Sequence, residues 1–571
     1  MSQLVDTIVA TASATDRGLV TGDPQAPQRQ AWAQVHKQAR QVAHGLVADG
    51  LRPGGSVALL AAEPAWIAPA VQGVWLAGGS VTMLHQPTPR TQLADWVRDT
   101  LRALDLVGAD VVLLDTSFAA VAAELAGHRV RYRMLADMIG TAGTAGTSDT
   151  AADATVVPVP TGEHDIALLQ LTSGTTALPK AVRITHGNLL ANIVAMAERG
   201  HLDPGEDVMM SWLPLFHDMG MIAFMALPMT LGLELVKLTP GDFLGAPLVW
   251  PTLLARFSVT ITGAPNFGYA LLRKQLATVQ DPAAFDLSAL RIALNGAEPI
   301  DEAVVRGLAE AGARFGLRSD CMLAAYGLAE ATLAVSAASP SGGLRVDVVD
   351  SARLDAGVAA PAEPGSATRT FSRLGMPLRG VKVAVLGPDG TRLGERQIGE
   401  LMVRGESVTP GYLTVEGPVD AHDEEGWLHT GDLGYLADGE VVVCGRSKDV
   451  IIMAGRNIYP TDIERAAASV DGVRAGNVAA VRIDAGSRRE GFAIVLESRY
   501  AGDTDAELAL SRQVVAQVIE AVDARPVTVR VVPPGSLSKT PSGKLRRAEA
   551  AMHLAAGQTA AGTPEPSVSA V

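Results

Sequence analysis

Residues 56–84 read SVALLAAEPAWIAPAVQGVWLAGGSVTML, and their pattern decides the predicted fold. An apolar run at 56–62 leads into a helical pattern, and a second apolar run follows at 80–84. Strands that are apolar throughout are typical of a parallel sheet covered on both faces. The stretch therefore predicts a strand–helix–strand unit, and the apolar runs at 111–115 and 259–265 continue the pattern. We expect an α/β fold with doubly wound sheets in the large N-terminal part of the chain.

Composition excludes several classes of protein. The chain has 571 residues, 48% hydrophobic and 19% charged, which suits about three or four domains or subdomains with large apolar cores. Its net charge is −14 and it lacks a long basic run, so we expect no nucleic acid partner. Cys321 and Cys444 offer neither a disulfide framework nor a cysteine metal site, which favours a reducing, cytoplasmic setting. The apolar stretch 219–233 is shorter than the roughly 17–25 residues of a membrane span, so we expect no integral membrane association.

The chain is expected to divide into a large and a small domain. The large one covers 1–446, and hairpin patterns with Asp-Gly turns predict a β-rich subdomain at about 370–446. From Thr461 the sequence TDIE predicts a capping box, and strand and helix patterns follow it. We therefore expect a small, mobile α+β domain at 447–556 and a disordered tail at 557–571.

Residues 169–188, LQLTSGTTALPKAVRITHGN, contain a candidate phosphate loop. The stretch fails the GxxxxGKS/T pattern, because Gly174 is the single glycine before Lys180 and this lysine follows a proline. It leaves an apolar strand, however, and its hydroxyl and backbone N–H groups can wrap the terminal phosphates of a nucleotide. The alternative is an ordinary solvated loop.

Polar side chains in apolar surroundings mark two further candidates. In WLPLFHDMGM, His217 and Asp218 either cap a buried helix or line the polar end of an apolar substrate channel. In AYGLAEATL, Tyr326 can stack on a purine. The Glu330 carboxylate of the same motif either binds a metal such as Mg²⁺ or faces solvent on a short helix.

Three more motifs lie towards the C-terminus. Asp432, in WLHTGDLGY, either satisfies N–H groups of a turn or accepts the two hydroxyls of a ribose. Charged residues at 446–449 lie where a hinge between two domains is expected. The basic stretch LSKTPSGKLRR at 537–547 is either a solvated loop or a clamp on a phosphoryl group.

Taken in order, these motifs resemble the adenylate-forming superfamily, which includes acyl-CoA synthetases, fatty acyl-AMP ligases, luciferases and the adenylation domains of peptide synthetases. The similarity runs from about Trp32 to Arg547 and includes LTSGTTALPK, YGLAE, WLHTGDLGY, GRSKDVIIMAGRNIYP and LSKTPSGKLRR. The forms SWLPLFHDMGM, YGLAEATL and GRNIYPTDIE are more similar to fatty acyl-AMP ligases than to acyl-CoA synthetases. The long segment between Glu330 and the LGMPLRG motif at 374–380 is in keeping with that subgroup.

The resemblance implies a role for each matching residue. Lys544 is the catalytic lysine of the small domain, Glu330 holds Mg²⁺, and His217 stands near the reacting carboxylate. Lys448 marks the hinge. The other implied residues bind ATP: the phosphate loop Thr172, Ser173, Gly174, Thr175, Thr176 and Lys180, the adenine pocket Gly296, Ala297, Glu298 and Tyr326, and the ribose-binding Asp432 and Arg446.

The implied reaction is the ATP-dependent activation of a medium- or long-chain fatty acid to acyl-AMP, with release of pyrophosphate and transfer to an acyl carrier protein. Coenzyme A is the alternative acceptor, and ATP and Mg²⁺ are the implied cofactors. The apolar stretches 219–238 and 248–257 either line an acyl tunnel or form core. Ala177 and Ala329 depart from the family pattern, which has a glycine and a hydroxyl residue there.

Two other functions stay open. An amino-acid-activating enzyme would need a carboxylate to anchor the α-amino group, and the expected anchor is absent near 214–218, where the chain reads PLFHD. The second alternative is a nucleotide-binding paralogue without catalytic activity. The presence of Lys544, Glu330 and Asp432 argues against it.

Overall fold

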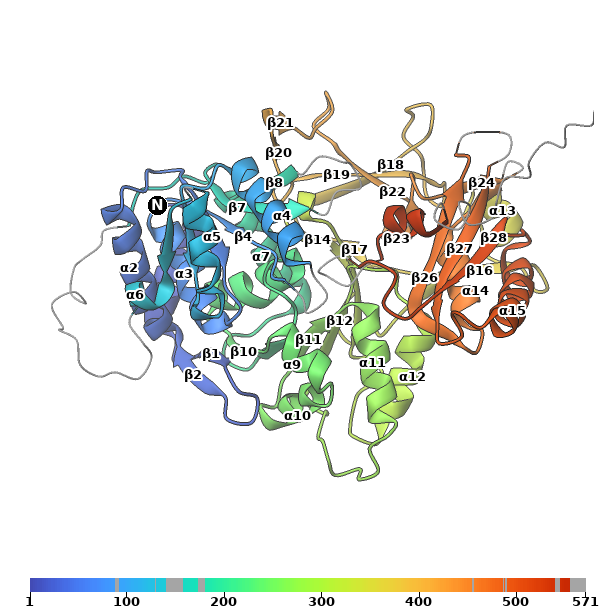
Figure 1. The fold of residues 1–571 in the computed structure, drawn as a ribbon, viewed down its shortest axis with the longest axis horizontal. Coiled ribbons are helices and arrows are strands. Elements are labelled where there is room, and N and C mark those ends of the chain that lie inside the picture. The colour runs from blue at the N-terminus through green and yellow to red at the C-terminus, as the bar shows by residue number, and fades with distance from the viewer. Residues whose placement is uncertain are drawn as a thin grey trace, which may run out of the picture.

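The structure is a computed structural model, shown in Figure 1 with the N-terminal helices at one end and the last sheet of the chain at the other. The residues that it describes are 1–87, 92–128, 130–139, 158–172, 180–453, 456–485, 487, 490–539 and 545–554.

The stretch 56–84 forms the predicted strand–helix–strand unit. It consists of β3 (Ser56–Leu60), α3 (Pro64–Leu76) and β4 (Ser80–Met83). The two strands pair in parallel, and β3 pairs on its other side with β5 (Val111–Leu114). All residues of these strands are buried, as expected for strands that are covered on both faces.

Two large sheets contain this unit and its continuation. In the described residues, one sheet has eight strands in the order β21 (Gly417–Asp420), β20 (Gly411–Thr414), β8 (Lys180–Thr185), β7 (Ile166–Thr172), β4, β3, β5 and β6 (Tyr132–Met134). The other, counted over the same residues, has nine in the order β17 (Met376–Pro377), β14 (Ala334–Ala337), β13 (Met322–Gly327), β12 (Ile292–Asn295), β11 (Ile261–Ala264), β9 (Val208–Ser211), β10 (Glu234–Lys237), β1 (Gly18–Thr21) and β2 (Gln28–Ala31). The central strands are parallel. Antiparallel strands close both edges of the nine-stranded sheet and one edge of the eight-stranded sheet, whose other edge strand, β6, is parallel to β5, so the α/β fold is confirmed.

Helices connect the strands of these sheets and cover them. The α-helices of this part are α1 (Gln3–Ala14), α2 (Trp32–Ala48), α3, α4 (Leu93–Val107), α5 (Val121–Gly127), α6 (Leu135–Ile139), α7 (His186–Gly200), α8 (Leu227–Leu231), α9 (Pro240–Gly245), α10 (Val249–Arg256), α11 (Asn266–Leu276), α12 (Glu302–Ala313) and α13 (Ser351–Asp355). Three shorter or irregular helices are η1 (Thr116–Phe118), the π-helix η2 (Met219–Ala226) and η3 (Ala329–Ala331). In the described part of the chain, no helix combines the length and the apolar character needed to cross a membrane.

The region after the nine-stranded sheet is rich in antiparallel strands. One sheet has the order β18 (Val381–Leu386), β19 (Gly399–Gly405), β22 (Leu428–Ala437) and β23 (Glu440–Arg446), and a separate hairpin pairs β15 (Val346–Asp350) with β16 (Thr368–Ser372). β22 and β23 are joined by Asp438 and Gly439, whose φ angles are 55° and 75°. Two positive φ angles in a two-residue loop match the twist of the strands, which explains the Asp-Gly hairpin that the sequence predicts.

The last part of the chain folds around an apolar cluster that includes Ile463, Phe492 and Val514. Its elements are β24 (Ile451–Met453), β25 (Arg456–Ile458), α14 (Pro460–Ala468), β26 (Val473–Ile483), β27 (Gly491–Ser498), α15 (Thr504–Val522), β28 (Thr528–Val532) and α16 (Arg547–Ala550). β27 pairs antiparallel with β26 and parallel with β28.

The predicted capping box at Thr461 is wrong. α14 begins one residue earlier, at Pro460, and Tyr459 occupies the cap position without a side-chain hydrogen bond. Proline is favoured in the first helical position because the missing N–H would have no partner there. Glu464 does not reach back to the cap, since its carboxylate pairs with Arg547 at 2.7 Å.

Candidate active site

A cavity of about 2590 Å³ is lined by residues of both large sheets, of the β22–β23 hairpin and of the C-terminal sheet. Every predicted site residue that the structure describes lines this cavity: Thr172, Lys180, His217, Gly296, Ala297, Glu298, Tyr326, Glu330, Asp432, Arg446 and Lys448. Ser173, Gly174, Thr175, Thr176 and Lys544 lie outside the described residues, as does Ala177. Leu545 and Arg546, which follow Lys544 in sequence, do line the cavity.

A buried carboxylate stands at one wall of the cavity. Asp432 on β22 lies opposite Arg446 on β23 in the strand pairing, and the Arg446 Nε lies 2.8 Å from the Asp432 Oδ1. The Tyr326 hydroxyl donates to the Asp432 Oδ2 at 2.5 Å. Burial, together with the neighbouring Asp432, raises the pKa of Tyr326, so its hydroxyl stays protonated. A carboxylate held in this way can accept further hydroxyl groups from a ligand in the cavity.

Cationic groups gather at a neighbouring wall. The Lys180 Nζ lies 3.5 Å from the centre of the Tyr412 ring, and the Tyr412 hydroxyl donates to the Glu330 Oε1 at 3.0 Å. Burial lowers the pKa of Lys180, the charges of Lys448 and Arg446 lower it further, and Glu330 opposes them. Lys180, Lys448 and Arg446 repel one another at close range. An anion bound beside them would attract all three and offset this repulsion, so its binding would be stabilised.

Tyr412 lines the cavity and contacts both Lys180 and Glu330, and the sequence did not predict it as a site residue. It lies on β20, where it pairs opposite Val182 on β8, so the contact with Lys180 joins segments more than two hundred residues apart. Neither Tyr412 nor the segment GYLT around it is among the predicted site motifs. The pairing of β20 with β8 was the missing information.

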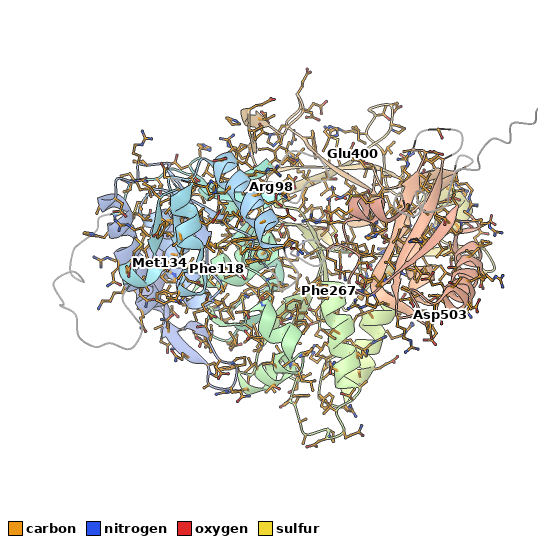
Figure 2. The ribbon with its side chains drawn as sticks, in the orientation of Figure 1. Arg98, Phe118, Met134, Phe267, Glu400 and Asp503 are labelled. Atoms are coloured by element: carbon orange, nitrogen blue, oxygen red, sulfur yellow. The ribbon has the colours of Figure 1, made fainter. Side chains whose placement is uncertain are left out.

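The loop after β12 forms another wall. Ala297 has a φ of 69°, in the left-handed region, and Gly296 lies so near the Ala325 carbonyl that a Cβ would be 3.1 Å from its oxygen. The Glu298 Oε1 accepts a hydrogen bond from the Phe267 backbone N–H at 2.6 Å, which ties the loop to the start of α11. Figure 2 shows Phe267 near the middle of the view. The loop is therefore held in a tight conformation with its backbone at the cavity, which suits a flat ligand.

His217 and Asp218 lie at the start of η2 and at the cavity wall. The Asp218 Oδ1 accepts from the Met219 N–H at 2.7 Å and so caps η2, and the same oxygen lies 2.7 Å from the His217 Nδ1. Both side chains also line the cavity. The segment is fixed from the other large sheet, because the Gln170 amide on β7 donates to the Phe216 carbonyl at 2.9 Å.

His85 is a second residue that the sequence reasoning missed. It follows β4, lines the cavity, and packs edge-on against the Phe216 ring with 5.1 Å between ring centres. Burial lowers its pKa to about 4, helped by the charge of Arg546 and by His217. His85 is therefore neutral near neutral pH. Its position after an apolar strand was a signal, since ligands gather at the ends of parallel strands.

An apolar arm extends the cavity along the nine-stranded sheet. It is lined by side chains of four strands and of the segment at 219–227, namely Met209, Ile261, Ile292, Leu294, Leu323, Met219, Ala223, Phe224 and Leu227. The stretch 219–238 thus lines the cavity in part. The stretch 248–257 does not line it within the described residues, and the fully buried Trp250 shows that it forms core.

Comparison with known proteins gives consistent matches. The family model described as AMP-binding enzyme matches residues 10–413. A Mycobacterium tuberculosis protein named as the ligase Rv1013 is 48% identical over 550 residues, covering 96% of this chain and 99% of its own. The medium-chain-fatty-acid–acyl-carrier-protein ligase JamA of Moorena producens is 34% identical over 401 residues, which is 67% of this chain and 66% of its own. A solved structure from a study of fatty acyl-adenylate ligases of E. coli and L. pneumophila has a TM-score of 0.85 and 29% identity, covering 98% of this chain and 99% of that chain.

Proposed function

Because this chain belongs to the AMP-binding enzymes, the adenylate-forming ligases that its motifs resemble, we propose that it activates a medium- or long-chain fatty acid with ATP. The first step forms acyl-AMP and releases pyrophosphate, and the acyl group then passes to an acyl carrier protein. One observation supports this above all: the polar walls around Asp432 and Lys180 and the apolar arm belong to a single continuous cavity. A nucleotide and an apolar chain can therefore meet in it.

In this proposal ATP lies against the polar walls. Its adenine lies against the loop at 296–298 and the Tyr326 ring, and its ribose hydroxyls donate to Asp432. Its phosphates lie beside Lys180. In this arrangement the Asp432 carboxylate accepts hydrogen bonds from the ribose hydroxyls, and the cationic side chains face the phosphates.

The fatty acid enters with its chain in the apolar arm and its carboxylate near His217. A carboxylate oxygen attacks the α-phosphorus, the new P–O bond forms, and the bond to pyrophosphate breaks. Both reactants are anions, so the step needs positive charge that is already in position. Lys180, Arg446 and Lys448 supply it within the described residues, and we propose that Lys544 adds its charge at the reacting oxygens.

The family implies Mg²⁺, and the residues present fit it. In the described part of the chain, no cluster of three acidic, histidine or cysteine side chains offers a cage made of protein alone. Mg²⁺ is usually bound by one or two carboxylates together with substrate phosphates. Glu330 would hold it there, and the bound ion would neutralise charge on the phosphate oxygens.

The acceptor is proposed from the contacts of the segment at 447–556, which we propose to be a domain that turns about Lys448. The Arg456 Nε lies 3.0 Å from Asp355 of α13, and the Arg369 Nε on β16 lies 3.8 Å from Asp462. These ion pairs are only partly exposed and resist such a turn. A protein acceptor can bury more surface than a small molecule and so offset their loss, and the relative JamA is named for a carrier protein. Coenzyme A remains the alternative.

The acceptor assignment is tested by incubating the enzyme with ATP, Mg²⁺ and a fatty-acid series, with either coenzyme A or holo acyl carrier protein. Mass spectrometry then identifies the thioester. We expect acyl carrier protein to be loaded faster than coenzyme A. Acyl-CoA as the sole thioester would overturn the acceptor, and absence of acyl-AMP with every acid would overturn the function.

A further inference from the structure

The apolar arm is built in rows across the nine-stranded sheet. Strand pairing sets Met209, Ile261 and Ile292 in one row and Gly263, Leu294 and Leu323 in the next. Side chains on the same face of a strand follow every second residue, about 7 Å apart. The second row therefore lies nearer to the loop at 296–298, and the first row lies about 7 Å deeper.

Gly263 leaves a gap in the second row, and Phe224 fills it. A Cβ at Gly263 would lie 2.7 Å from the Phe224 Cζ and 2.8 Å from its Cε2, so the ring occupies the place of the missing side chain. Phe224 is 1% exposed and lines the cavity. Its φ of −121° and ψ of 24° depart from helical geometry within η2. Irregular π-type turns often place a side chain at a functional site.

Resting on the proposed function, we propose that the Phe224 ring sets the length of the fatty acyl chain. A short chain ends before it reaches the ring. A longer chain has to pass the ring to reach Ile261 and Ile292, which line the cavity beyond it. Straight chains that end before the ring are then the preferred substrates, because they fill the arm without displacing the ring.

Two substitutions should change the opening of the apolar arm in opposite directions. Phe224→Leu removes the ring and opens the way to the deeper row. Gly263→Ala places a methyl group where the ring lies and pushes the ring into the cavity. The measured quantity is the ratio of kcat/KM for palmitate to kcat/KM for octanoate in acyl-AMP formation. We expect Phe224→Leu to raise this ratio roughly tenfold and Gly263→Ala to lower it by a similar factor, since a few buried methylene contacts are involved.

Matched controls lie in the core near Trp212. Phe243 is fully buried and stacks on the Trp212 ring with 4.0 Å between ring centres, and a Cβ at Gly268 would lie 2.7 Å from the Trp212 Cζ2. Neither residue is among the cavity-lining residues of the described chain. Phe243→Leu and Gly268→Ala repeat the same chemical changes away from the arm. We expect them to lower the thermal midpoint and leave the palmitate-to-octanoate ratio unchanged.

The outcomes separate the two levels of the proposal. Opposite shifts of the ratio in the two arm variants, with no shift in the controls, would support the role of Phe224. If both folded arm variants keep the wild-type ratio, or if the controls shift it equally, the role of Phe224 is overturned while the proposed function stands. If Gly263→Ala does not fold, Phe224→Leu against Phe243→Leu decides alone. If the wild type forms no acyl-AMP with any acid, the function fails and this inference with it.

Discussion

Replacing Asp432 by asparagine tests whether its carboxylate binds the ribose of ATP. In the structure this carboxylate accepts from the Tyr326 hydroxyl at 2.5 Å and lies 2.8 Å from the Arg446 Nε, so its position is fixed before ATP arrives. Asparagine keeps the shape but turns one acceptor oxygen into a donor NH₂ group. A hydrogen bond to a charged group contributes about 1.5–3 kcal/mol, which corresponds to roughly 10–150-fold in affinity. We expect Asp432→Asn to weaken ATP binding by a factor in this range.

The assay is isothermal titration calorimetry with ATP and with 2′-deoxy-ATP, on the wild type and on Asp432→Asn. The wild type should bind the deoxynucleotide more weakly than ATP, and the variant should largely lose this difference, because the partner of the 2′-hydroxyl is gone. Asp420→Asn serves as the control and should behave as wild type, because Asp420 is an exposed residue at the end of β21 whose carboxylate hydrogen-bonds His422. Equal discrimination between the two nucleotides by wild type and Asp432→Asn would refute ribose binding by Asp432.

Three further predictions concern charge, motion and pH. Lys544→Ala should abolish acyl-AMP formation while ATP still binds, because cationic stabilisation in the transition state is removed, and pyrophosphate release at the wild-type rate would contradict this. Lys448→Pro should slow thioester formation more than adenylation, in stopped-flow or quench measurements of each step; equal slowing would refute the hinge. His186 is fully buried, and burial lowers its pKa to about 4. The unfolded chain therefore takes up a proton as the pH falls from about 6.5 to about 4 and the folded chain does not, so stability falls by about 2 kcal/mol by pH 5. His186→Gln should weaken this dependence of the thermal midpoint on pH. If the midpoint falls with pH equally in variant and wild type, His186 is not the cause.

The sequence alone predicted those structural elements that depend on a local pattern of residues. The unit at 56–84 follows from continuous apolar runs, and the β22–β23 hairpin follows from Asp438 and Gly439, which need no distant partner to turn the chain. The capping box failed for a local and a non-local reason: Pro460 takes the first helical position, and Arg547, more than eighty residues from Glu464, takes the carboxylate that the box would use.

The residues of the candidate site also differ in whether the local sequence predicts them. Residues such as Asp432 and Glu330 belong to recognisable motifs and do line the cavity, although their roles stay predictions. Tyr412 reaches the site through strand pairing between distant segments, and His85 through its place after β4 and its packing against Phe216. The place of Phe224 likewise depends on Gly263, a contact between a helix and a strand that the local sequence does not encode.

The central claim is that one cavity holds ATP and a fatty acid so that they react with each other. It is tested most directly by the isotopic exchange of labelled pyrophosphate into ATP, with and without fatty acid and without any acceptor. We expect exchange that requires Mg²⁺ and a medium- or long-chain fatty acid and that disappears in Lys544→Ala. Exchange that is absent with every fatty acid, or that does not depend on the acid, would contradict it.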